Sequence, residues 1–397
     1  MVRVLVHALG ATAGGGLGYL RHLLTFARSY PANQWVLLVP EAFETGVPLP
    51  EHVRLLRFPG LKGRGSRLFF DQYRLRSLIR REQVDVMLAT GNFGLLRPPV
   101  PQILLNRNAL YFSREHRERL WERGELAESA NILLRQKLAL ASIRHSQVNV
   151  VPSRAMELAI REWLPADANP RFEVIPHGFD PNTFHAACEN FPRVRQVLAS
   201  RRPRVLLVSH YNYFRNFETL IRALAILRDE LHTRATLLLT TRLAPGLRDH
   251  RYDTTQAAEL IGRLALWDQV EMLGTVPRDS IRSLYDAADI VACPSYVESF
   301  GHPLVEAMAC GKPIVASGIP IHREVCGEGA LYFPTYDPRA LALRLHQLVH
   351  NPALAQRLVA RGGEQWKRFS WDDHFHRLLG VLEPLAERGM AGKGMAA

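Results

Sequence analysis

The chain has 397 residues, 47% of them hydrophobic, and a formal net charge of +12 at pH 7. This length predicts two domains of ordinary size, and the lack of any run of about 18 apolar residues argues against a membrane-spanning helix. The basic charge favours a negatively charged partner, such as a phosphate-bearing substrate or an anionic lipid surface. No zinc-finger, homeodomain or RNA-binding sheet pattern is present, so no nucleic-acid partner is expected.

The four cysteines form no CxxC pair, and no histidine cluster has metal-ligand spacing; the cysteines are Cys188, Cys293, Cys310 and Cys326. We therefore expect reduced thiols, no metal site and a cytoplasmic protein. The first residues already have the pattern of a strand, so no signal peptide is expected.

Apolar strand segments alternate with helical stretches along the first half of the chain. The expected strands are 2–9, 35–39, 53–58, 84–89, 102–105, 148–151 and 172–175, and the expected helices cover about 17–29, 66–82, 113–145 and 153–163. The second half repeats this alternation, with expected strands at 205–209, 235–240, 270–273, 290–293, 313–316 and 330–333. Such alternation predicts an α/β protein with parallel sheets and right-handed crossovers.

The pattern is interrupted near 180–203, where proline and polar residues replace the apolar runs. We therefore predict a first domain at 1–187 and a second at 188–370. Ser370, with Asp373 three residues later, has the pattern of a helix N-cap, so a last helix is expected from residue 371. The tail after Arg388 is rich in Gly, Ala and Met and is expected to be flexible.

A glycine-rich loop follows the first strand and leads into a helix, from Gly10 to Gly18. Glycine allows the backbone to approach a ligand closely, although such a loop can also be only a tight turn. Its spacing does not fit a dinucleotide-binding fingerprint, and no acidic residue ends a suitable second strand. A dehydrogenase is therefore disfavoured.

The stretch from Lys62 to Arg81 interleaves arginines with leucine and phenylalanine; the arginines are Arg64, Arg67, Arg74, Arg76, Arg80 and Arg81. A basic amphipathic helix of this kind can lie on an anionic membrane surface. The preferred interpretation is the ordinary solvated face of a helix packed on the core.

The most informative stretch is 290–317, which predicts a strand, a loop, a short helix and a second strand. Pro303 suits the first helical turn, and Gly311 suits the helix end. The N–H groups at a helix N-terminus bind phosphate, and loops at the carboxyl ends of parallel strands hold ligands. Glu298 in the loop and Glu306 in the helix can contact what the phosphate carries, although this spacing alone also fits two solvated glutamates.

The string E-S-F-G-H-P-L-V-E-A-M-A-C-G-K-P-I-V-A, from Glu298 to Ala316, resembles the donor-binding signature of retaining nucleotide-sugar glycosyltransferases of family 4. The resemblance is strong over the second domain and loose over the first. It implies the GT-B fold, in which two Rossmann-like, doubly wound domains face each other across a cleft and the final helix, here within 371–397, returns to the first domain. It also implies a hexosyltransferase that moves a sugar from a nucleotide diphosphate donor to an acceptor hydroxyl, without a metal or other cofactor.

The resemblance assigns a role to each motif of the second domain. The donor diphosphate would be bound by His210, Arg215 and the N–H groups around Ser299, Phe300, Gly301 and His302. Glu306 would hold the ribose, Glu298 would contact the transferred sugar, and the segment with Thr275 and Val276 would meet the base. The family usually has an arginine and a lysine where this chain has His210 and Arg215, so the presence of His210 is a departure.

In the first domain the resemblance brings Gly15 and Gly16 near the donor phosphates and the acceptor. The histidine that the family often places after a middle strand is missing here, and Arg107 and Asn108 are the candidates for its catalytic contact with the donor sugar. The acceptor would be a sugar, a lipid-linked glycan or a small molecule, with peripheral membrane contact in the lipid-linked case. Two alternatives stay open: a nucleotide-sugar epimerase of the same fold, and a non-catalytic protein that binds sugars or membranes.

Overall fold

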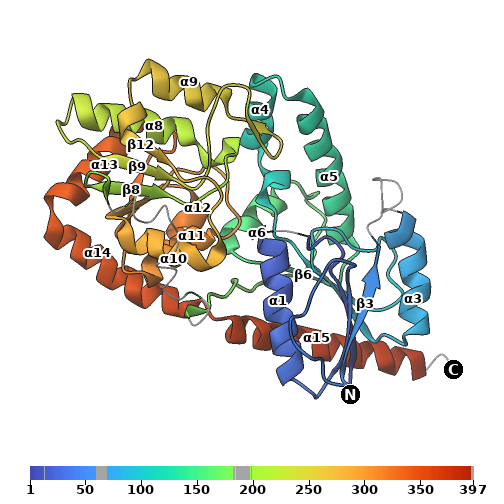
Figure 1. The fold of residues 1–397 in the computed structure, drawn as a ribbon. Helices are drawn as coiled ribbons and strands as arrows, with labels where there is room; N and C mark the ends of the chain where they lie inside the picture. Colours follow the sequence, from blue (N-terminus) through green and yellow to red (C-terminus); the bar gives the residue numbers. More distant parts are fainter. Residues whose placement is uncertain (13, 60–68, 182–183, 185–196, 198, 395–397) are drawn as a thin grey trace. The chain divides into compact units, whose positions relative to one another are not determined.

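The computed structural model describes the chain except for residues 13, 60–68, 182–183, 185–196, 198 and 395–397 (Figure 1). It divides into two compact units, one of Met1–Gly178 with Trp371–Ala397 and one of Phe179–Ser370. The first unit therefore ends at Gly178, before the predicted boundary at 187. The reason is local, because the Phe179 N–H donates to the Phe369 carbonyl at 2.9 Å and the Phe179 ring contacts Trp366.

The first unit contains a seven-stranded parallel sheet in the order β3-β2-β1-β4-β5-β6-β7. Its strands are β1 Arg3–His7, β2 Gln34–Pro40, β3 Val53–Phe58, β4 Val86–Ala89, β5 Gln102–Leu105, β6 Val148–Val151 and β7 Phe172–Val174. The residues of β4, β5 and β6 are all buried, as expected of strands covered by helices on both faces. All seven strands fall where the sequence predicted them.

Two of the expected helices of this unit are divided or only partly described. The expected helix at 113–145 is two helices, α4 Arg114–Glu122 and α5 Leu126–Arg144, because Gly124 between them has φ of 74°. Of the expected helix at 66–82, residues 66–68 lie outside the described part; a π-helical turn, Phe70–Arg74, leads into α3 Leu75–Arg81. The remaining helices are α1 Gly14–Ser29, α6 Arg154–Arg161 and α15 Trp371–Gly394, with a 3-10 turn at Ala109–Phe112.

The last helix, α15, is part of the core of the first unit although it comes from the end of the chain. Leu378 and Leu382 of α15 share a buried cluster with Leu20 and Leu23 of α1 and with apolar residues of the sheet. Figure 1 shows α15 running beside α1. The apolar face of α15 is buried in part by α1, whose residues precede it by more than 300 positions, so this unit is closed by a long-range contact.

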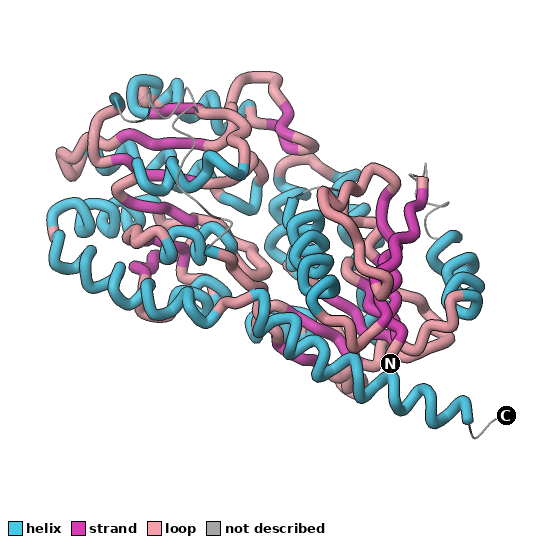
Figure 2. The backbone as a smooth tube through the Cα atoms, turned by 60° about the horizontal axis from the view of Figure 1, so that its bottom comes forward, coloured by secondary structure: helices cyan, strands magenta, loops and turns pink. Residues whose placement is uncertain are grey.

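The second unit contains a six-stranded parallel sheet in the order β12-β9-β8-β13-β14-β15. Its strands are β8 Arg204–Leu207, β9 Thr236–Leu239, β12 Val270–Met272, β13 Ile290–Cys293, β14 Ile314–Ser317 and β15 Ala330–Phe333. Its helices are α8 Phe217–Asp229, α9 Thr255–Arg263, α10 Arg278–Ala287, α11 His302–Ala309, α12 Pro320–Cys326, α13 Pro338–His350 and α14 Pro352–Gln365. The tube in Figure 2 shows its strands between two sets of helices.

A small antiparallel hairpin, β10 Arg248–Asp249 with β11 Tyr252–Asp253, was not predicted from the sequence. Each of its strands has only two residues, which is too short to produce a period-two pattern. Among the described helices of both units, none is long and apolar enough to cross a bilayer.

In each sheet the strand that comes first in the sequence lies in the interior. The next strands follow on one side of it, and the later strands lie on its other side. In the second unit β8 lies between β9 and β13, so the connections that leave β8 and β13 run to opposite sides. Such a topological switch point is where open α/β sheets bind ligands, at the carboxyl ends of the strands. The loops that follow β8 and β13 carry most of the predicted site residues.

Candidate active site

Arg215 and Glu298 form an ion pair at the switch point of the second unit. Arg215 ends a 3-10 turn in the loop after β8, and Glu298 lies in the loop after β13. Arg215 Nη1 contacts Glu298 Oε2 and donates to Ser295 Oγ at 3.3 Å. The pair is largely buried, with 20% of the Arg215 side chain and 11% of the Glu298 side chain exposed. The structure therefore brings two predicted site residues into direct contact.

The surroundings of Glu298 keep its carboxyl group ionised. Burial alone would raise the pKa of Glu298, but Arg215, the Ser299 N–H and His322 together outweigh it, so the pKa lies below its ordinary value. The Ser299 N–H donates to Glu298 Oε1 at 3.0 Å. Both carboxylate oxygens therefore have partners, and the group is held as an oriented anion.

Asn216 joins the two loops that carry this ion pair. Its side-chain amide donates to the Pro294 carbonyl at 3.1 Å and to the Thr335 carbonyl at 2.8 Å, and its side-chain oxygen accepts from Thr219 Oγ1 at 2.8 Å. Its backbone is left-handed, with φ of 56°. Asparagine is among the residues that adopt this conformation readily, so one residue both turns the chain into α8 and fixes the loop after β13. Sequence reasoning missed Asn216; the available signal was its position next to the candidate Arg215.

The helix α11 begins directly beyond the Glu298 loop. Gly301 is its N-cap, with φ of 90°, and a Cβ atom at this position would lie 3.0 Å from Leu304 Cδ1. Only glycine fits this conformation without strain. Pro303 occupies the first turn, as predicted, and places no N–H there that would need a partner. Ser299, Phe300, Gly301 and His302 thus surround the positive end of the α11 dipole, which attracts an anion.

Glu306 lies one turn inside α11 and is paired with a tyrosine. Tyr285 from α10 donates its hydroxyl proton to Glu306 Oε2 at 2.9 Å. Burial raises the pKa of Glu306, and the Tyr285 hydrogen bond and Arg278 offset only part of this effect. The pKa values of the two glutamates in this motif are therefore shifted in opposite directions. Glu306 is harder to ionise than an ordinary carboxyl group, and Glu298 is easier to ionise.

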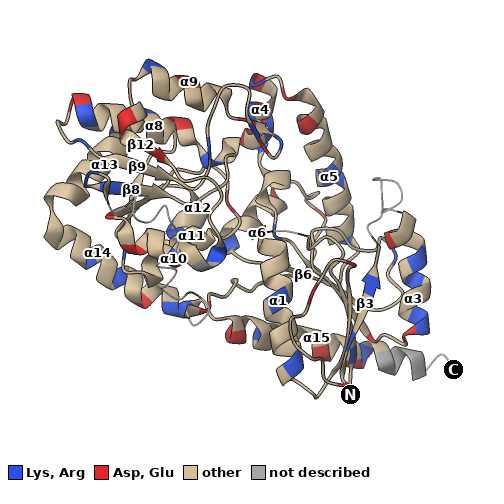
Figure 3. Ribbon diagram, viewed as in Figure 1, with Lys and Arg blue, Asp and Glu red and all other residues tan. Residues whose placement is uncertain are grey.

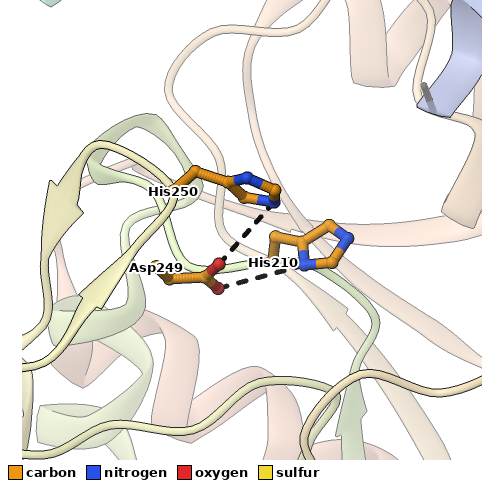
Figure 4. Close-up of side chains that lie close together, drawn as sticks. All are labelled: His210, Asp249 and His250. Carbon is orange, nitrogen blue, oxygen red and sulfur yellow. Dashed lines mark ion pairs between the residues drawn. The ribbon is translucent and has the colours of Figure 1, made fainter. Parts of the chain in front are cut away.

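His210 lies in the loop after β8, beside the hairpin that the sequence did not predict (Figure 4). His210 Nδ1 is 3.9 Å from Asp249 Oδ2, and His250 Nε2 is 3.8 Å from Asp249 Oδ1. The ligand atoms of these three residues lie within 4.8 Å of one another, which is close enough to hold a metal ion. Because β10 was missed, this group was not predicted from the sequence.

The same carboxylate has further roles in the local fold. Asp249 Oδ2 accepts from the Tyr211 N–H and from Thr241 Oγ1, both at 2.8 Å. The exposed fractions of the His210 and His250 side chains are 54% and 71%, against 18% for Asp249. Asp249 thus orients the start of the β8 loop, while the two imidazoles are open to solvent.

Thr275 and Val276 follow β12, the strand at one edge of the same sheet. The Gly274 N–H donates to the Thr241 carbonyl at 3.3 Å, and the Ser209 N–H donates to Thr240 Oγ1 at 2.8 Å. The carboxyl ends of β8, β9 and β12 are thereby connected. Thr275 is exposed and Val276 is partly exposed.

The predicted residues of the first unit are also at the carboxyl ends of strands. Gly15 and Gly16 lie in the first turn of α1, so this helix begins earlier than the predicted residue 17. Arg107 and Asn108 follow β5, and their N–H groups both donate to Asn92 Oδ1, at 3.1 and 3.2 Å. The Asn108 side-chain oxygen accepts from the Leu110 N–H at 3.0 Å and caps a 3-10 turn. The structure thus gives Asn108 a capping role, and Asn92 is a positioning residue that sequence reasoning missed.

The described cysteines are free thiols, as expected. Cys293 and Cys326 are buried, and Cys310 is partly buried. Burial raises the pKa of Cys293 and Cys310 to about 12, so neither is a reactive thiolate at neutral pH. Cys188 lies outside the described residues.

Comparison with known proteins links the second unit to a family of enzymes. Residues 190–365 match the family of group 1 glycosyl transferases. The chain is 35% identical over 236 residues to a D-inositol 3-phosphate glycosyltransferase of Salinispora tropica, which covers 56% of this chain and 48% of that protein. It thus spans about half the length of the curated relatives it matches.

Solved structures with a similar fold cover nearly the whole chain. Sucrose-phosphate synthase from Thermosynechococcus elongatus has a TM-score of 0.74 at 20% identity, with 96% of this chain and 98% of that chain covered. The Anabaena protein HepE, solved with UDP-glucose, has a TM-score of 0.69 at 19% identity, with coverages of 96% and 99%. The predicted GT-B fold class, with two parallel-sheet α/β domains, is confirmed.

Residues 190–365, which lie within the second unit, thus match the group 1 glycosyl transferases, and the resemblance of residues 298–316 to a glycosyltransferase signature is confirmed at that level.

Proposed function

We propose that this chain is a retaining glycosyltransferase that moves a hexose from a nucleotide diphosphate sugar to an acceptor hydroxyl, without a metal ion. The observation that carries the proposal is the Arg215–Glu298 pair beside the N-terminus of α11, in a unit whose residues 190–365 match a glycosyltransferase family. This arrangement puts a fixed cation, a fixed carboxylate and a helix N-terminus at the place where α/β sheets bind ligands.

In this proposal the second unit binds the donor. Arg215, His210 and the N–H groups at the start of α11 stabilise the diphosphate as it leaves with negative charge. A guanidinium can bind two phosphate oxygens at once. Glu306 accepts a hydrogen bond from the ribose, and the segment with Thr275 and Val276 contacts the base.

Glu298 serves to orient the transferred sugar and is not a nucleophile. Its two carboxylate oxygens are engaged by Arg215 and the Ser299 N–H, so neither is free to attack an anomeric carbon. The departing phosphate is the base that takes the acceptor proton on the same face of the sugar, which retains the anomeric configuration. Arg107 of the first unit supplies the contact that replaces the missing histidine.

The acceptor, a sugar, lipid-linked glycan or small molecule, binds to the first unit in this proposal. The free thiols fit a reducing compartment, and we propose the cytoplasm. One relative is named for D-inositol 3-phosphate and one structural neighbour was solved with UDP-glucose. These names make UDP-glucose and a polyol phosphate the first donor and acceptor to assay.

The experiment that tests the proposal is a panel of nucleotide sugars, assayed with and without acceptors. Transfer or slow hydrolysis of one donor supports a glycosyltransferase. If NMR shows that the product has the same anomeric configuration as the donor, the enzyme is retaining. Conversion of the donor sugar without any acceptor would identify an epimerase instead. Binding of sugars without turnover of any donor would identify a non-catalytic protein. Arg215→Ala is the matched variant, and it should abolish turnover of the donor found.

A further inference from the structure

Arg107 lies at the carboxyl end of the parallel sheet of the first unit. Its backbone is fixed by Asn92, as described above, and its guanidinium carbon lies 4.8 Å from the centre of the Tyr19 ring. Tyr19 is itself held in place, because its hydroxyl group lies 3.0 Å from His374 Nε2 and His374 Nδ1 lies 2.7 Å from the Pro176 carbonyl. The position of the Arg107 side chain is therefore set by buried neighbours.

The Arg107 guanidinium has no anionic partner among the described residues. Its Nε is buried without a hydrogen-bond partner, and no carboxylate of the described chain forms an ion pair with it. Burial lowers the pKa of Arg107. Its neighbour His374 is neutral, because burial, opposed in part by the Pro176 carbonyl and assisted by Arg107, lowers the pKa of His374 to about 4. The cluster thus holds one partly buried positive charge.

The first turn of α1 adds to this positive potential. This helix has 16 residues and no acidic residue in its first turn, so the positive end of its dipole is not offset locally. A Cβ atom at Gly16 would lie 3.7 Å from Arg107 Nη2, and one at Gly15 would meet nothing within 4 Å. The guanidinium of Arg107 is therefore adjacent to the first turn of α1, where Gly16 has no side chain to separate the two.

Taking a cation partly out of water without a counter-charge costs solvation free energy, and a neutral hydroxyl group does not offset that cost. Proteins accept such a cost where a ligand supplies the opposite charge. In the proposed reaction the donor diphosphate already has Arg215, His210 and the start of α11 as partners. The charge of Arg107 is thus available to a different anionic group.

We infer that Arg107 and the first turn of α1 form a subsite for an anionic group, a phosphate or a carboxylate, carried by the sugar substrate in addition to the donor diphosphate. This inference rests on the proposed function. Two sources share the chemistry: a phosphate on the acceptor, and the carboxylate of a uronic acid donor. Either anion can accept two parallel hydrogen bonds from the guanidinium.

The first experiment uses calorimetry on the full chain with UDP present at saturation. The probes are glucose 6-phosphate and inorganic phosphate, with glucose as the neutral control. The wild type should bind the phosphate probes, and Arg107→Met should bind them about tenfold or more weakly, since a hydrogen bond to a charged group contributes at least one factor of ten. Arg107→Lys should restore part of the affinity, and the exposed Arg144→Gln should match the wild type.

The second experiment compares UDP-glucuronate with UDP-glucose as ligands of the same four proteins. A selective loss for UDP-glucuronate in Arg107→Met assigns the anion to the donor, and a selective loss for glucose 6-phosphate assigns it to the acceptor. Equal affinities of the wild type and Arg107→Met for all anionic probes would overturn the inference. A loss of UDP affinity itself in Arg107→Met would overturn it too, because the charge would then belong to the diphosphate.

The folded state of Arg107→Met is checked by its melting temperature. Because the variant removes an uncompensated cation, it should melt at or above the temperature of the ligand-free wild type. Failure of every protein, including the wild type, to bind UDP would instead count against the proposed function. The two failures are therefore distinguishable.

Discussion

Arg215 and Glu298 are 83 residues apart in the chain and in contact in the fold. The contact exists because β8 and β13 are neighbours in one parallel sheet, so the loops at their carboxyl ends meet. It couples the residue proposed to stabilise the leaving diphosphate to the residue proposed to orient the sugar. Removing either partner should therefore affect both stability and donor binding.

Glu298→Gln leaves Arg215 largely buried without its counter-charge, so we expect a loss of about 2 kcal/mol in the free energy of unfolding at pH 7. The folded pKa of Glu298 is lowered, so its contribution is present above the ordinary carboxyl pKa and is lost as the pH falls through the lowered value. The difference between the two proteins should therefore shrink on acidification. Urea unfolding at pH 7 and at about pH 3.5 measures it. The exposed Glu364→Gln is the control, and a constant difference at both pH values would contradict the buried ion pair.

Glu306→Gln should have the opposite effect on stability while weakening the donor site. The folded pKa of Glu306 is raised, so the unfolded state ionises first and the wild type loses stability as the pH rises from the ordinary carboxyl pKa through the raised folded value. Glutamine keeps an acceptor for Tyr285 and avoids this loss, so the variant should be at least as stable at pH 8. Its affinity for UDP should fall by about 1–3 kcal/mol. Calorimetry with UDP decides the ribose assignment, and unchanged affinity would contradict it.

Asn216→Ala should disconnect the loops after β8 and β13, because both amide hydrogen bonds are lost and alanine disfavours the left-handed backbone. We expect a loss of about 2 kcal/mol in stability and weaker UDP binding. Asn216→Gly, which accepts the backbone conformation, isolates the hydrogen bonds. If the glycine variant behaves like the wild type, the side-chain contacts of Asn216 have no role in holding the site.

Turnover of the donor should continue in EDTA, because Arg215 and the start of α11 carry the charge stabilisation in the proposed mechanism. The group of His210, Asp249 and His250 makes this a sharp test, since it is close enough to bind a metal ion. His250→Ala, whose side chain is mostly exposed, should leave the rate in EDTA unchanged. Loss of activity in EDTA with recovery in Zn²⁺, absent in His250→Ala, would show that the reaction uses that group as a metal site.

The arginine-rich helix α3 predicts binding to anionic membranes if the acceptor is lipid-linked. Figure 3 shows its basic residues along one helix, and the exposed rings of Phe69 and Tyr73 stack beside it. Arg74, Arg80 and Arg81 are exposed, and each contributes about 1 kcal/mol near an anionic surface. Replacing all three by glutamine should release the protein from anionic vesicles and leave UDP binding intact.

Sedimentation with vesicles at low and high salt measures this effect. Neutral vesicles are the control, because they lack the surface charge that attracts arginine. If both proteins sediment equally, or neither sediments, the membrane prediction is contradicted. The basic side of α3 is then an ordinary solvated helix face.

The sequence by itself determined the strands and the donor motif. Thirteen predicted strands all appear, because buried parallel strands are continuous apolar runs whose signal is local. The start of α11 was equally readable, since glycine permits the positive φ at Gly301 and proline fixes the φ of the first turn at Pro303. These features depend on a few neighbouring residues, so the chain encodes them in a short window.

Only the tertiary structure decided which charged residues meet. The partners Arg215 with Glu298, Asp249 with His210, and Asn92 with Arg107 come from loops brought together by strand order. The partial burial of Arg107 without a carboxylate partner among the described residues is of the same kind. Charge and hydrogen bonding act through space over a few ångströms, and the sequence places no constraint on that distance until the sheet has formed.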